Sequence, residues 1–170
     1  MVEDDLFSYQ AKNSTEKKKL YLFDAMGFLF RSYYAIQAPL RDKNNKPTNA
    51  IYGFARALLK VLREHNPDYI VVIFDAPGKT FREEMFPEYK ANRPEPPKDF
   101  VQQIPRTIEL VKNLNITTLF KEGFEADDVI ATLSQKATEE GFEVVIVSGD
   151  KDLLQLLGPN VKMFDSFREG

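Results

Sequence analysis

Residues 69–80 have the sequence YIVVIFDAPGKT, in which an unbroken apolar run is followed by Asp75, Pro77 and Gly78. Continuous apolar residues, rather than apolar–polar alternation, are typical of a strand that is covered on both faces in a parallel sheet. Proline and glycine directly after the run indicate a turn. The stretch therefore predicts an α/β protein in which Asp75 lies at the carboxyl end of a buried strand.

The rest of the chain repeats this pattern of short apolar runs separated by amphipathic segments. The runs that predict further strands are residues 20–23, 117–120, 144–147 and 161–164, the last at a sheet edge. The segments that predict helices are residues 49–65, 99–113, 125–141 and 151–157. Alternating strands and helices predict a three-layer α/β/α sandwich with a mostly parallel central sheet.

Local signals predict how two of these helices begin. We expect Thr48 to cap the helix over 49–65. The apolar residues expected on the buried face of that helix are Tyr52, Ala55, Leu58, Leu59 and Leu62. Asp99 and Gln102 resemble a capping box at the start of the next helix, which Pro105 should bend.

The whole chain has the length and composition of one globular domain, with 170 residues, 43% hydrophobic and 29% charged. Residues 1–18 are predicted to be a flexible polar leader, and residues 19–170 the folded domain. The net charge of −3 excludes a uniformly basic nucleic-acid coat, so binding of nucleic acid would need a local patch. No apolar run approaches a membrane span, and we expect no membrane partner.

The scarcity of Cys and His limits the kinds of catalytic and metal-binding site that the chain can form. The chain has no Cys and one His, which excludes a thiolate nucleophile and the usual structural zinc site. The single histidine, His65, lies at a predicted helix end, where a cation suits the helix dipole, and no Ser-His-Asp set is evident. The absence of Cys also fits a cytosolic protein. Hydrolysis would then depend on carboxylates, Lys, Arg, Tyr and hard metal ions.

Acidic residues follow the predicted strands. Asp24, Asp75 and Asp150 each lie within three residues of a strand end, and the carboxyl ends of parallel strands meet at one edge of a sheet. Four more acids are expected at the same edge: Glu125, Asp127, Asp128 and Asp152. An aspartate after a strand often only caps the next helix, but capping does not explain so many acids together.

A cluster of carboxylates requires a counter-charge. Two like charges about 4 Å apart repel by about 1 kcal/mol in water and by about 4 kcal/mol at an effective dielectric constant of about 20. Without His or Cys ligands, an all-oxygen site selects Mg²⁺ or Mn²⁺. Carboxylates around two such ions about 3.5–4 Å apart are used for phosphodiester hydrolysis. The residues therefore predict a metal-dependent nuclease.

Three other phosphate chemistries do not fit the spacing. The GKT sequence at residues 78–80 resembles the end of a P-loop, but a P-loop needs a glycine where this chain has Ile73. A dehalogenase-type phosphatase needs a second aspartate two residues after the first, and none follows Asp24 at that spacing. A receiver domain needs its acidic pair after the first strand, whereas the pair at residues 127–128 comes much later.

Residues 78–97 form a proline-rich segment without a strand pattern, here called the basic insert. Basic residues interleaved with aromatic ones are the combination that binds a single-stranded backbone and stacks its bases. The basic residues are Lys79, Arg82, Lys90 and Arg93, with Lys98 just beyond, and the aromatic ones are Phe81, Phe86 and Tyr89. Four glutamates in the segment dilute this charge.

Four ordered motifs match a known family. They are FDAMGFLFRSYYA (23–35), IFDAPGKTFREEMFPEYKANRP (73–94), GFEADDVIATL (123–133) and SGDKDLLQL (148–156). Together they resemble the 5′-nuclease domain of bacterial DNA polymerase I, in the flap-endonuclease-like branch of the PIN-like superfamily. The resemblance covers residues 20–164. It implies a PIN-like, resolvase-like fold in which the basic insert forms a helical arch or clamp for a 5′ strand.

The resemblance also implies roles for individual residues. The metal-binding acids would be Asp24, Asp75, Glu125, Asp127, Asp128, Asp150 and Asp152. The DNA-contacting residues would be Arg31, Lys79, Arg82, Tyr89, Lys90 and Arg93. Asp24 and Asp75 would act in catalysis through the metal, while Lys90 and Arg82 stabilise the added negative charge.

The implied substrate is DNA with a 5′ end or flap, cleaved during primer removal and repair. An RNA primer in an RNA–DNA hybrid is an alternative substrate. The resemblance further implies a monomeric protein of the bacterial cytoplasm, associated with the nucleoid.

The chain departs from the family pattern in two places. Family members have a further acidic motif and a helix-hairpin-helix, and neither occurs before Gly170. Because those acids would complete the second metal site, we expect a polymerase fragment with reduced or no activity in isolation. Ala25 replaces the usual glycine after the first aspartate. Two other functions stay open: a non-catalytic DNA-binding or scaffolding module, and a PIN-like ribonuclease, although such ribonucleases usually lack the insert.

Overall fold

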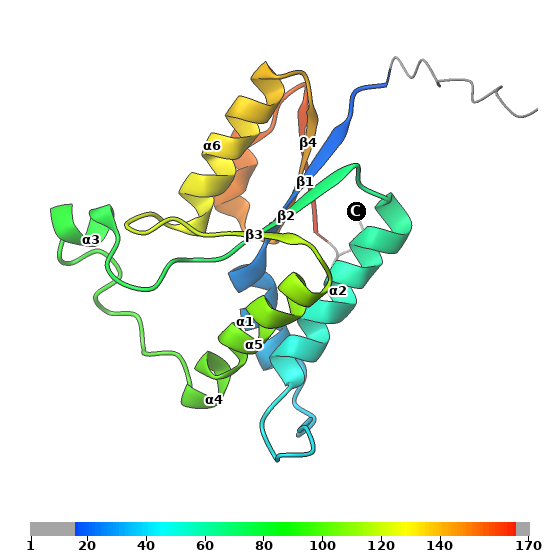
Figure 1. Cartoon of the computed structure of the whole chain (residues 1–170). Helices are drawn as coiled ribbons and strands as arrows, with labels where there is room; N and C mark the ends of the chain where they lie inside the picture. Colours follow the sequence, from blue (N-terminus) through cyan, green and yellow to red (C-terminus); the bar gives the residue numbers. More distant parts are fainter. Residues whose placement is uncertain (1–15, 166–170) are drawn as a thin grey trace, which may run out of the picture.

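A five-stranded parallel sheet forms the centre of the molecule (Figure 1). The computed structural model describes residues 16–165. The strands are β1 (Lys19–Asp24), β2 (Tyr69–Ile73), β3 (Thr117–Leu119), β4 (Glu143–Val147) and β5 (Val161–Phe164). They lie in the order β3-β2-β1-β4-β5, and every pairing is parallel. The predicted parallel sheet is therefore confirmed, including the edge position of the last strand.

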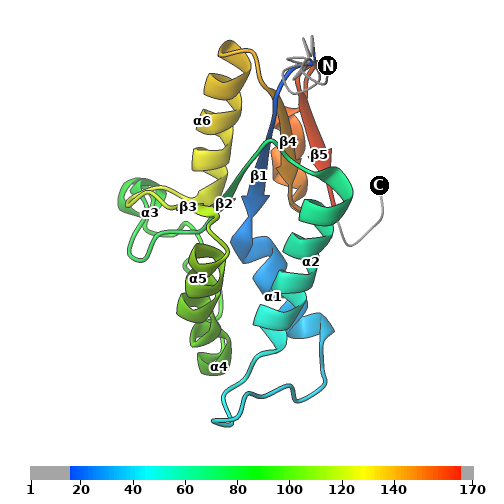
Figure 2. The same ribbon diagram turned by 45° about the vertical axis from the view of Figure 1, so that its right-hand side comes forward.

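Helices cover both faces of this sheet (Figure 2). They are α1 (Ala25–Ala35), α2 (Asn49–His65), α3 (Phe81–Met85), α4 (Lys98–Val101), α5 (Gln103–Asn113), α6 (Ala126–Glu139) and the 3₁₀ helix η1 (Lys151–Leu156). Helices α1, α2 and α5 share one apolar core with Phe23 and Val145, whereas α6 and η1 share the other with Leu22 and Ile146. Neighbouring strand residues thus face opposite layers, which confirms the three-layer sandwich.

Helix α1 is absent from the sequence-based prediction. Asp24 is its N-cap, and the Asp24 Oδ1 atom accepts a hydrogen bond of 3.2 Å from the Gly27 backbone N–H. Its buried residues are Ala25, Phe28, Leu29 and Ser32. An aspartate followed by buried positions at this spacing is a helix signal, so the sequence contains the information that was overlooked.

Helix α2 has the predicted bounds, and Leu58 is buried as predicted, but the rest of the buried face differs in part. Tyr52 is 50% exposed and Leu59 is 39% exposed, so their predicted burial is wrong. Small residues face α1 instead, because a Cβ atom at Gly53 would lie only 2.5 Å from Ser32 Cβ. The close approach of α1 and α2 decides which side of the helix is buried.

Thr48 occupies the predicted N-cap position of α2, but its side chain does not cap the helix. The fully buried Gln103, from α5, takes this role: its Oε1 atom accepts hydrogen bonds from the backbone N–H groups of Ala50 (2.9 Å) and Ile51 (3.3 Å). Because an amide oxygen can satisfy free N–H groups at a helix start, a distant residue replaces the local cap.

The predicted bent helix over 99–113 is two helices, α4 and α5, divided at Gln102. Pro105 lies in the first turn of α5, where its missing N–H removes the hydrogen bond that would continue α4. The predicted Asp99–Gln102 capping box is wrong. Pro97 is the N-cap of α4, and the Asp99 carboxylate accepts a 2.7 Å hydrogen bond from the Tyr33 hydroxyl.

The basic insert contains less helix than the expected arch. Its helix is the five-residue α3, and turns lead from there to α4. Two residues of the insert have left-handed backbone, Gly78 (φ +101°) and Lys90 (φ +58°). Within residues 16–165, no helix is both long and apolar enough to cross a membrane. The predicted leader falls mostly outside the described residues, although Lys17 Nζ donates to Asn160 Oδ1 at 2.8 Å.

Candidate functional site

Three neighbouring strands deliver three aspartates to one edge of the sheet. Asp24 is the last residue of β1, and Asp75 and Asp150 follow β2 and β4, the strands on either side of β1. The side chains are close enough to influence one another: burial, and then the charges of Asp75 and Asp150, raise the pKa of Asp24. The prediction that the strand-end acids gather is confirmed.

Ser148 joins two of these acids, and sequence reasoning missed it. Its hydroxyl is fully buried. It donates a 2.7 Å hydrogen bond to Asp24 Oδ2 and accepts one of 3.1 Å from the Asp150 backbone N–H. Because these hydrogen bonds link the end of β1 to the loop after β4, Ser148 fixes the position of Asp24 relative to Asp150. A hydroxyl directly after a buried strand was the available signal.

Asp127 is close enough to four other acids for their charges to influence it. It is in the first turn of α6, and its carboxylate accepts no hydrogen bond from any residue within 16–165. Burial, together with the charges of Asp24, Asp150, Asp75 and Glu125, raises the pKa of Asp127 to about 6. A partly buried carboxylate surrounded by four others lacks a counter-charge.

The raised pKa of Asp127, caused by burial and by neighbouring charges, predicts an unusual dependence of folding stability on pH. Between pH about 4, the pKa of an aspartate in an unfolded chain, and pH about 6, the folded protein binds more protons at Asp127 than the unfolded one. Folding stability should therefore fall as pH rises through this window, by about 1 kcal/mol after allowance for solvent screening.

The variant Asp127→Asn should remove that fall. At pH 7 without divalent cations, its melting temperature should exceed that of the wild type by about 3 °C. Melting curves from pH 4 to pH 7 measure the effect, with Asp68→Asn at the other end of the sheet as the control. If the melting temperatures of the wild type and Asp127→Asn change with pH in the same way, Asp127 does not cause the fall in stability.

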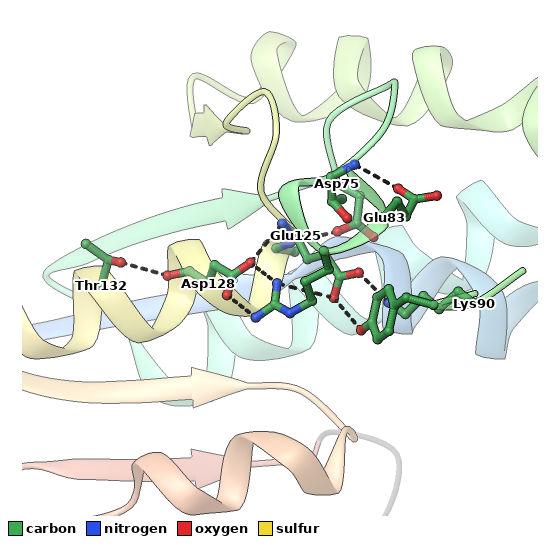
Figure 3. Close-up of polar contacts among 10 residues, drawn as sticks. Asp75, Glu83, Lys90, Glu125, Asp128 and Thr132 are labelled. Carbon is green, nitrogen blue, oxygen red and sulfur yellow. Dashed lines mark hydrogen bonds and ion pairs between the residues drawn. The ribbon is translucent and has the colours of Figure 1, made fainter. Parts of the chain in front are cut away.

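Asp128 in the first turn of α6 and Glu125 at its N-cap face the basic insert (Figure 3). Arg82 forms a bidentate pair with Asp128, at 2.5 and 2.6 Å. Lys90 Nζ donates to Glu125 Oε1 at 2.6 Å, and the Tyr89 hydroxyl donates to Glu125 Oε2 at 3.3 Å. Hydrogen bonds from Arg82 lower the pKa of Asp128. We call the Arg82–Asp128 and Lys90–Glu125 pairs the insert–edge contacts.

Asp75 also contacts the start of α6. Its Oδ1 atom accepts a 2.7 Å hydrogen bond from the Ala126 backbone N–H, one of the free donors at a helix start. Glu125 and Asp128 form a capping box around the same turn, and the Glu125 N–H donates to Asp128 Oδ2 at 3.1 Å. These hydrogen bonds fix α6 against the end of β2 and so hold Asp127 beside the strand-end acids.

Arg31 lies at the other side of the edge. It extends from α1, pairs with Asp165 at 2.8 Å, and packs so closely on Gly149 that a Cβ atom there would collide with its guanidinium group. An open pocket of about 460 Å³ is lined by Gly27, Arg31, Gly149, Asp150 and Lys151. The predicted substrate-contacting arginine is therefore adjacent to Asp150, in a pocket that can admit a phosphate.

The remaining predicted site residues are exposed and make few contacts with the rest of the site. Asp152 is exposed in η1, and its backbone N–H donates to Asp150 Oδ1 at 2.9 Å. Lys79 and Arg93 are exposed, and within residues 16–165 their side chains make no hydrogen bond or ion pair. Among the described residues, no three acids are arranged around a common point as a formed metal site. The seven-residue ligand set stays a prediction.

The donor chemistry nevertheless fits a hard divalent cation. Every available side-chain ligand at the edge is a carboxylate oxygen or a hydroxyl, as Mg²⁺ and Mn²⁺ prefer. Burial, and then the charges of neighbouring carboxylates, raise the pKa of Asp127, and no basic side chain among the described residues offsets them. The carboxylates of Asp24, Asp75, Asp127 and Asp150 are the best candidates to hold a cation, because none of them is paired with a basic side chain among the described residues.

Comparison with known proteins places this fold and site in a family. The family described as "5′-3′ exonuclease, N-terminal resolvase-like domain" matches residues 19–169. The chain is 45% identical over 152 residues to a 5′-3′ exonuclease of Aquifex aeolicus, covering 89% of this chain and 52% of the relative. It is 44% identical over 145 residues to DNA polymerase I of Chloroflexus aurantiacus, covering 85% of this chain and 15% of the polymerase.

Solved structures agree on the fold. A complex of the bacteriophage T5 flap endonuclease with DNA and metal ions has a TM-score of 0.68 and 21% identity, covering 86% of this chain and 54% of that one. Our chain thus spans about half the length of the Aquifex exonuclease and a smaller part of the polymerase. With the four motifs, the sheet order and the acids at its edge, the chain belongs to the family of 5′-3′ exonuclease N-terminal, resolvase-like domains.

Proposed function

We propose that this domain provides the catalytic acids of a metal-dependent 5′→3′ exonuclease or 5′-flap endonuclease that hydrolyses DNA phosphodiesters. The observation that supports this most directly is Asp127, whose pKa is raised to about 6 by burial and by four surrounding carboxylates. Such repulsion is relieved by divalent cations. The names of the exonuclease, polymerase and flap-endonuclease relatives point to the same reaction.

The finer assignments follow from the same reasoning. The cations would be Mg²⁺ or Mn²⁺, two in the longer protein, and the substrate would be DNA with a 5′ end or flap, or an RNA primer paired with DNA. Residues 19–170 would be the first part of the catalytic domain, after a leader at 1–18. The protein would act as a monomer near the bacterial nucleoid, without a membrane partner.

The protein's own residues divide into two groups. Asp24, Asp75, Asp127 and Asp150 would hold the cations, with Ser148 keeping Asp24 in place. Bound divalent cations neutralise phosphate charge and activate water for phosphodiester hydrolysis. Glu125, Asp128 and Asp152 complete the predicted set of acids.

Cationic side chains would hold the substrate from two sides. Arg31 would contact a phosphate in the pocket beside Asp150, and Lys90 and Arg82 would stabilise negative charge from the opposite side. Lys79, Tyr89 and Arg93 would contact the 5′ strand along the insert.

Cleavage of a 5′-labelled flap substrate tests the proposal. The 170-residue chain and a longer version that includes the expected second acidic motif are compared with Mg²⁺, with Mn²⁺ and with a chelator. The longer version should cleave only when a cation is present, and the 170-residue chain much more slowly or not at all. If the longer version binds DNA but stays inert with both ions, the non-catalytic module is the better assignment. Cleavage of RNA alone would favour the ribonuclease.

A further inference from the structure

The insert–edge contacts place protein cations on two acids of the candidate metal site. Lys90 and Glu125 are 2.6 Å apart, and their side chains are 31% and 15% exposed. Arg82 and Asp128 are 2.5 Å apart, with side chains 34% and 22% exposed. Both pairs join the basic insert to the first turn of α6, far away in the sequence. Positive charge from the chain thus occupies part of the acidic edge.

The two contacts differ in how easily a divalent cation can replace them. Asp128 uses both oxygens for a bidentate guanidinium pair, and Asp128 Oδ2 also accepts from the Glu125 N–H. Bidentate pairs of this kind are geometrically specific and strong. Lys90, in contrast, is a single flexible donor that acts as a point charge. The Arg82–Asp128 pair is therefore the fixed contact, and Lys90–Glu125 is the exchangeable one.

The backbone at Lys90 supports this difference. Lys90 has φ +58°, a left-handed conformation that costs energy for a residue with a side chain and persists only where surrounding contacts hold it. Its side chain contacts the Glu125 carboxylate and the neighbouring Tyr89 ring, with Lys90 Nζ 5.0 Å from the ring centre, and its backbone carbonyl accepts a 2.9 Å turn hydrogen bond from the Arg93 N–H. Loss of the Glu125 contact would let this segment relax.

Glu125 is the N-cap of α6, and Asp127 lies two residues later in the first turn of the same helix. A divalent cation bound at Asp127 would compete with Lys90 for the Glu125 carboxylate, because both are attracted by the same oxygen atoms. Tyr89 donates to the other Glu125 oxygen, Oε2, so neither oxygen is free while the insert is in place.

We propose that Lys90 is the exchangeable internal counter-ion of Glu125, and that a divalent cation displaces it from that carboxylate. Cation binding and release of the segment around Lys90 are then linked: each favours the other, while Arg82–Asp128 keeps the start of the insert attached. The released Lys90 ammonium group becomes available to a substrate phosphate only once the cation is bound. This inference rests on the proposed function in one respect, that the acidic edge binds a divalent cation.

Calorimetric titration with Mg²⁺ measures the competition without any substrate. If Lys90 must be displaced, Lys90→Ala should bind Mg²⁺ about five- to tenfold more tightly than the wild type. In the wild type, the apparent affinity is lowered because Mg²⁺ binds only those molecules in which Lys90 has left Glu125. Lys79→Ala is the matched control, since it removes the same charge from the same insert but breaks no ion pair among residues 16–165. It should change the affinity less than twofold.

A fluorescent reporter measures the release. The chain has no Trp, and Phe86 is 69% exposed between Arg82 and Lys90, so Phe86→Trp introduces a single tryptophan that can be excited apart from the tyrosines. Adding Mg²⁺ should lower its anisotropy with the same midpoint as the calorimetric titration. In Phe86→Trp combined with Lys90→Ala, the anisotropy should be low before Mg²⁺ is added.

The outcomes separate this inference from the proposed function. If the wild type binds Mg²⁺ but Lys90→Ala binds it equally or more weakly, or the reporter does not respond, the displacement of Lys90 is wrong and the metal site stands. If neither protein binds Mg²⁺ or Mn²⁺, the metal site itself is wrong, and the displacement with it. If Lys90→Ala binds Mg²⁺ more tightly and the Trp reporter responds to Mg²⁺, both the metal site and the displacement of Lys90 are supported.

Discussion

Asp75→Asn should lower flap cleavage by the longer protein by about 100- to 1,000-fold, because a cation ligand that supplies several kcal/mol of transition-state stabilisation is lost. Folding stability should change little. The Asp75 Oδ1 atom accepts a hydrogen bond from the Ala126 N–H, and an asparagine oxygen can accept the same bond. The change therefore removes charge and leaves the helix contact in place. Initial cleavage rates at saturating Mg²⁺ and a melting curve measure the two effects.

Asp68→Asn is the control for this variant. Asp68 precedes β2, whereas Asp75 follows it, and Asp68 Oδ2 also accepts a backbone hydrogen bond, from Lys19 at 2.8 Å. The same chemical change is thus made at the opposite end of one strand, and cleavage should stay within twofold of the wild type. Wild-type rates for Asp75→Asn would exclude Asp75 as a cation ligand, whatever the control shows.

Gly53→Ala should produce the largest loss of stability, about 2–3 kcal/mol. The new methyl carbon would lie 2.5 Å from Ser32 Cβ and 3.0 Å from Ile36 Cδ1. A Cβ atom cannot swing aside as a long side chain can, so α1 and α2 must move apart, and overpacking of this kind costs about 1–3 kcal/mol. The melting temperature should fall by about 5–10 °C in thermal unfolding.

A second substitution tests the cause of that loss. Ser32→Gly removes the atom that the new methyl group would meet, so the double variant should be more stable than the sum of the single effects predicts. Gly158→Ala serves as the control, because a Cβ atom there would meet nothing within 4 Å. Strict additivity of the two substitutions would indicate that the helices are not in contact at this point.

The sequence was sufficient for the sheet and for the position of the acids, since both depend on short-range patterns. Unbroken apolar runs with an acid within three residues of their ends predict β2 and β4 within one residue of their observed bounds. Helix α1 was overlooked because its residues, with Phe30, Tyr33 and Tyr34 among them, are apolar or aromatic on several sides. The face of α2 was misjudged because helix contact, not hydrophobicity, decides it.

The partners of the acids could not be predicted in the same way. The sequence motif predicts one shared role, as metal ligands, for residues 125, 127 and 128. On a helix, however, neighbouring residues project in different directions, about 100° apart. Asp127 consequently faces the strand-end acids, while Asp128 faces Arg82. Which acid lacks a counter-charge depends on how the insert folds back, and no local pattern encodes that.

Gln103 has a consequence for the order in which the molecule unfolds. It completes the first turn of α2 through Ala50 and Ile51, and its Nε2 atom donates to Asn49 Oδ1 at 3.0 Å and to the Asp99 carbonyl at 3.1 Å. The free N–H groups at the start of α2 are therefore satisfied by a residue of α5. Hydrogen exchange at the Ala50 amide should report separation of the two helices rather than local fraying of α2. Segments more than fifty residues apart thus open as one cooperative unit.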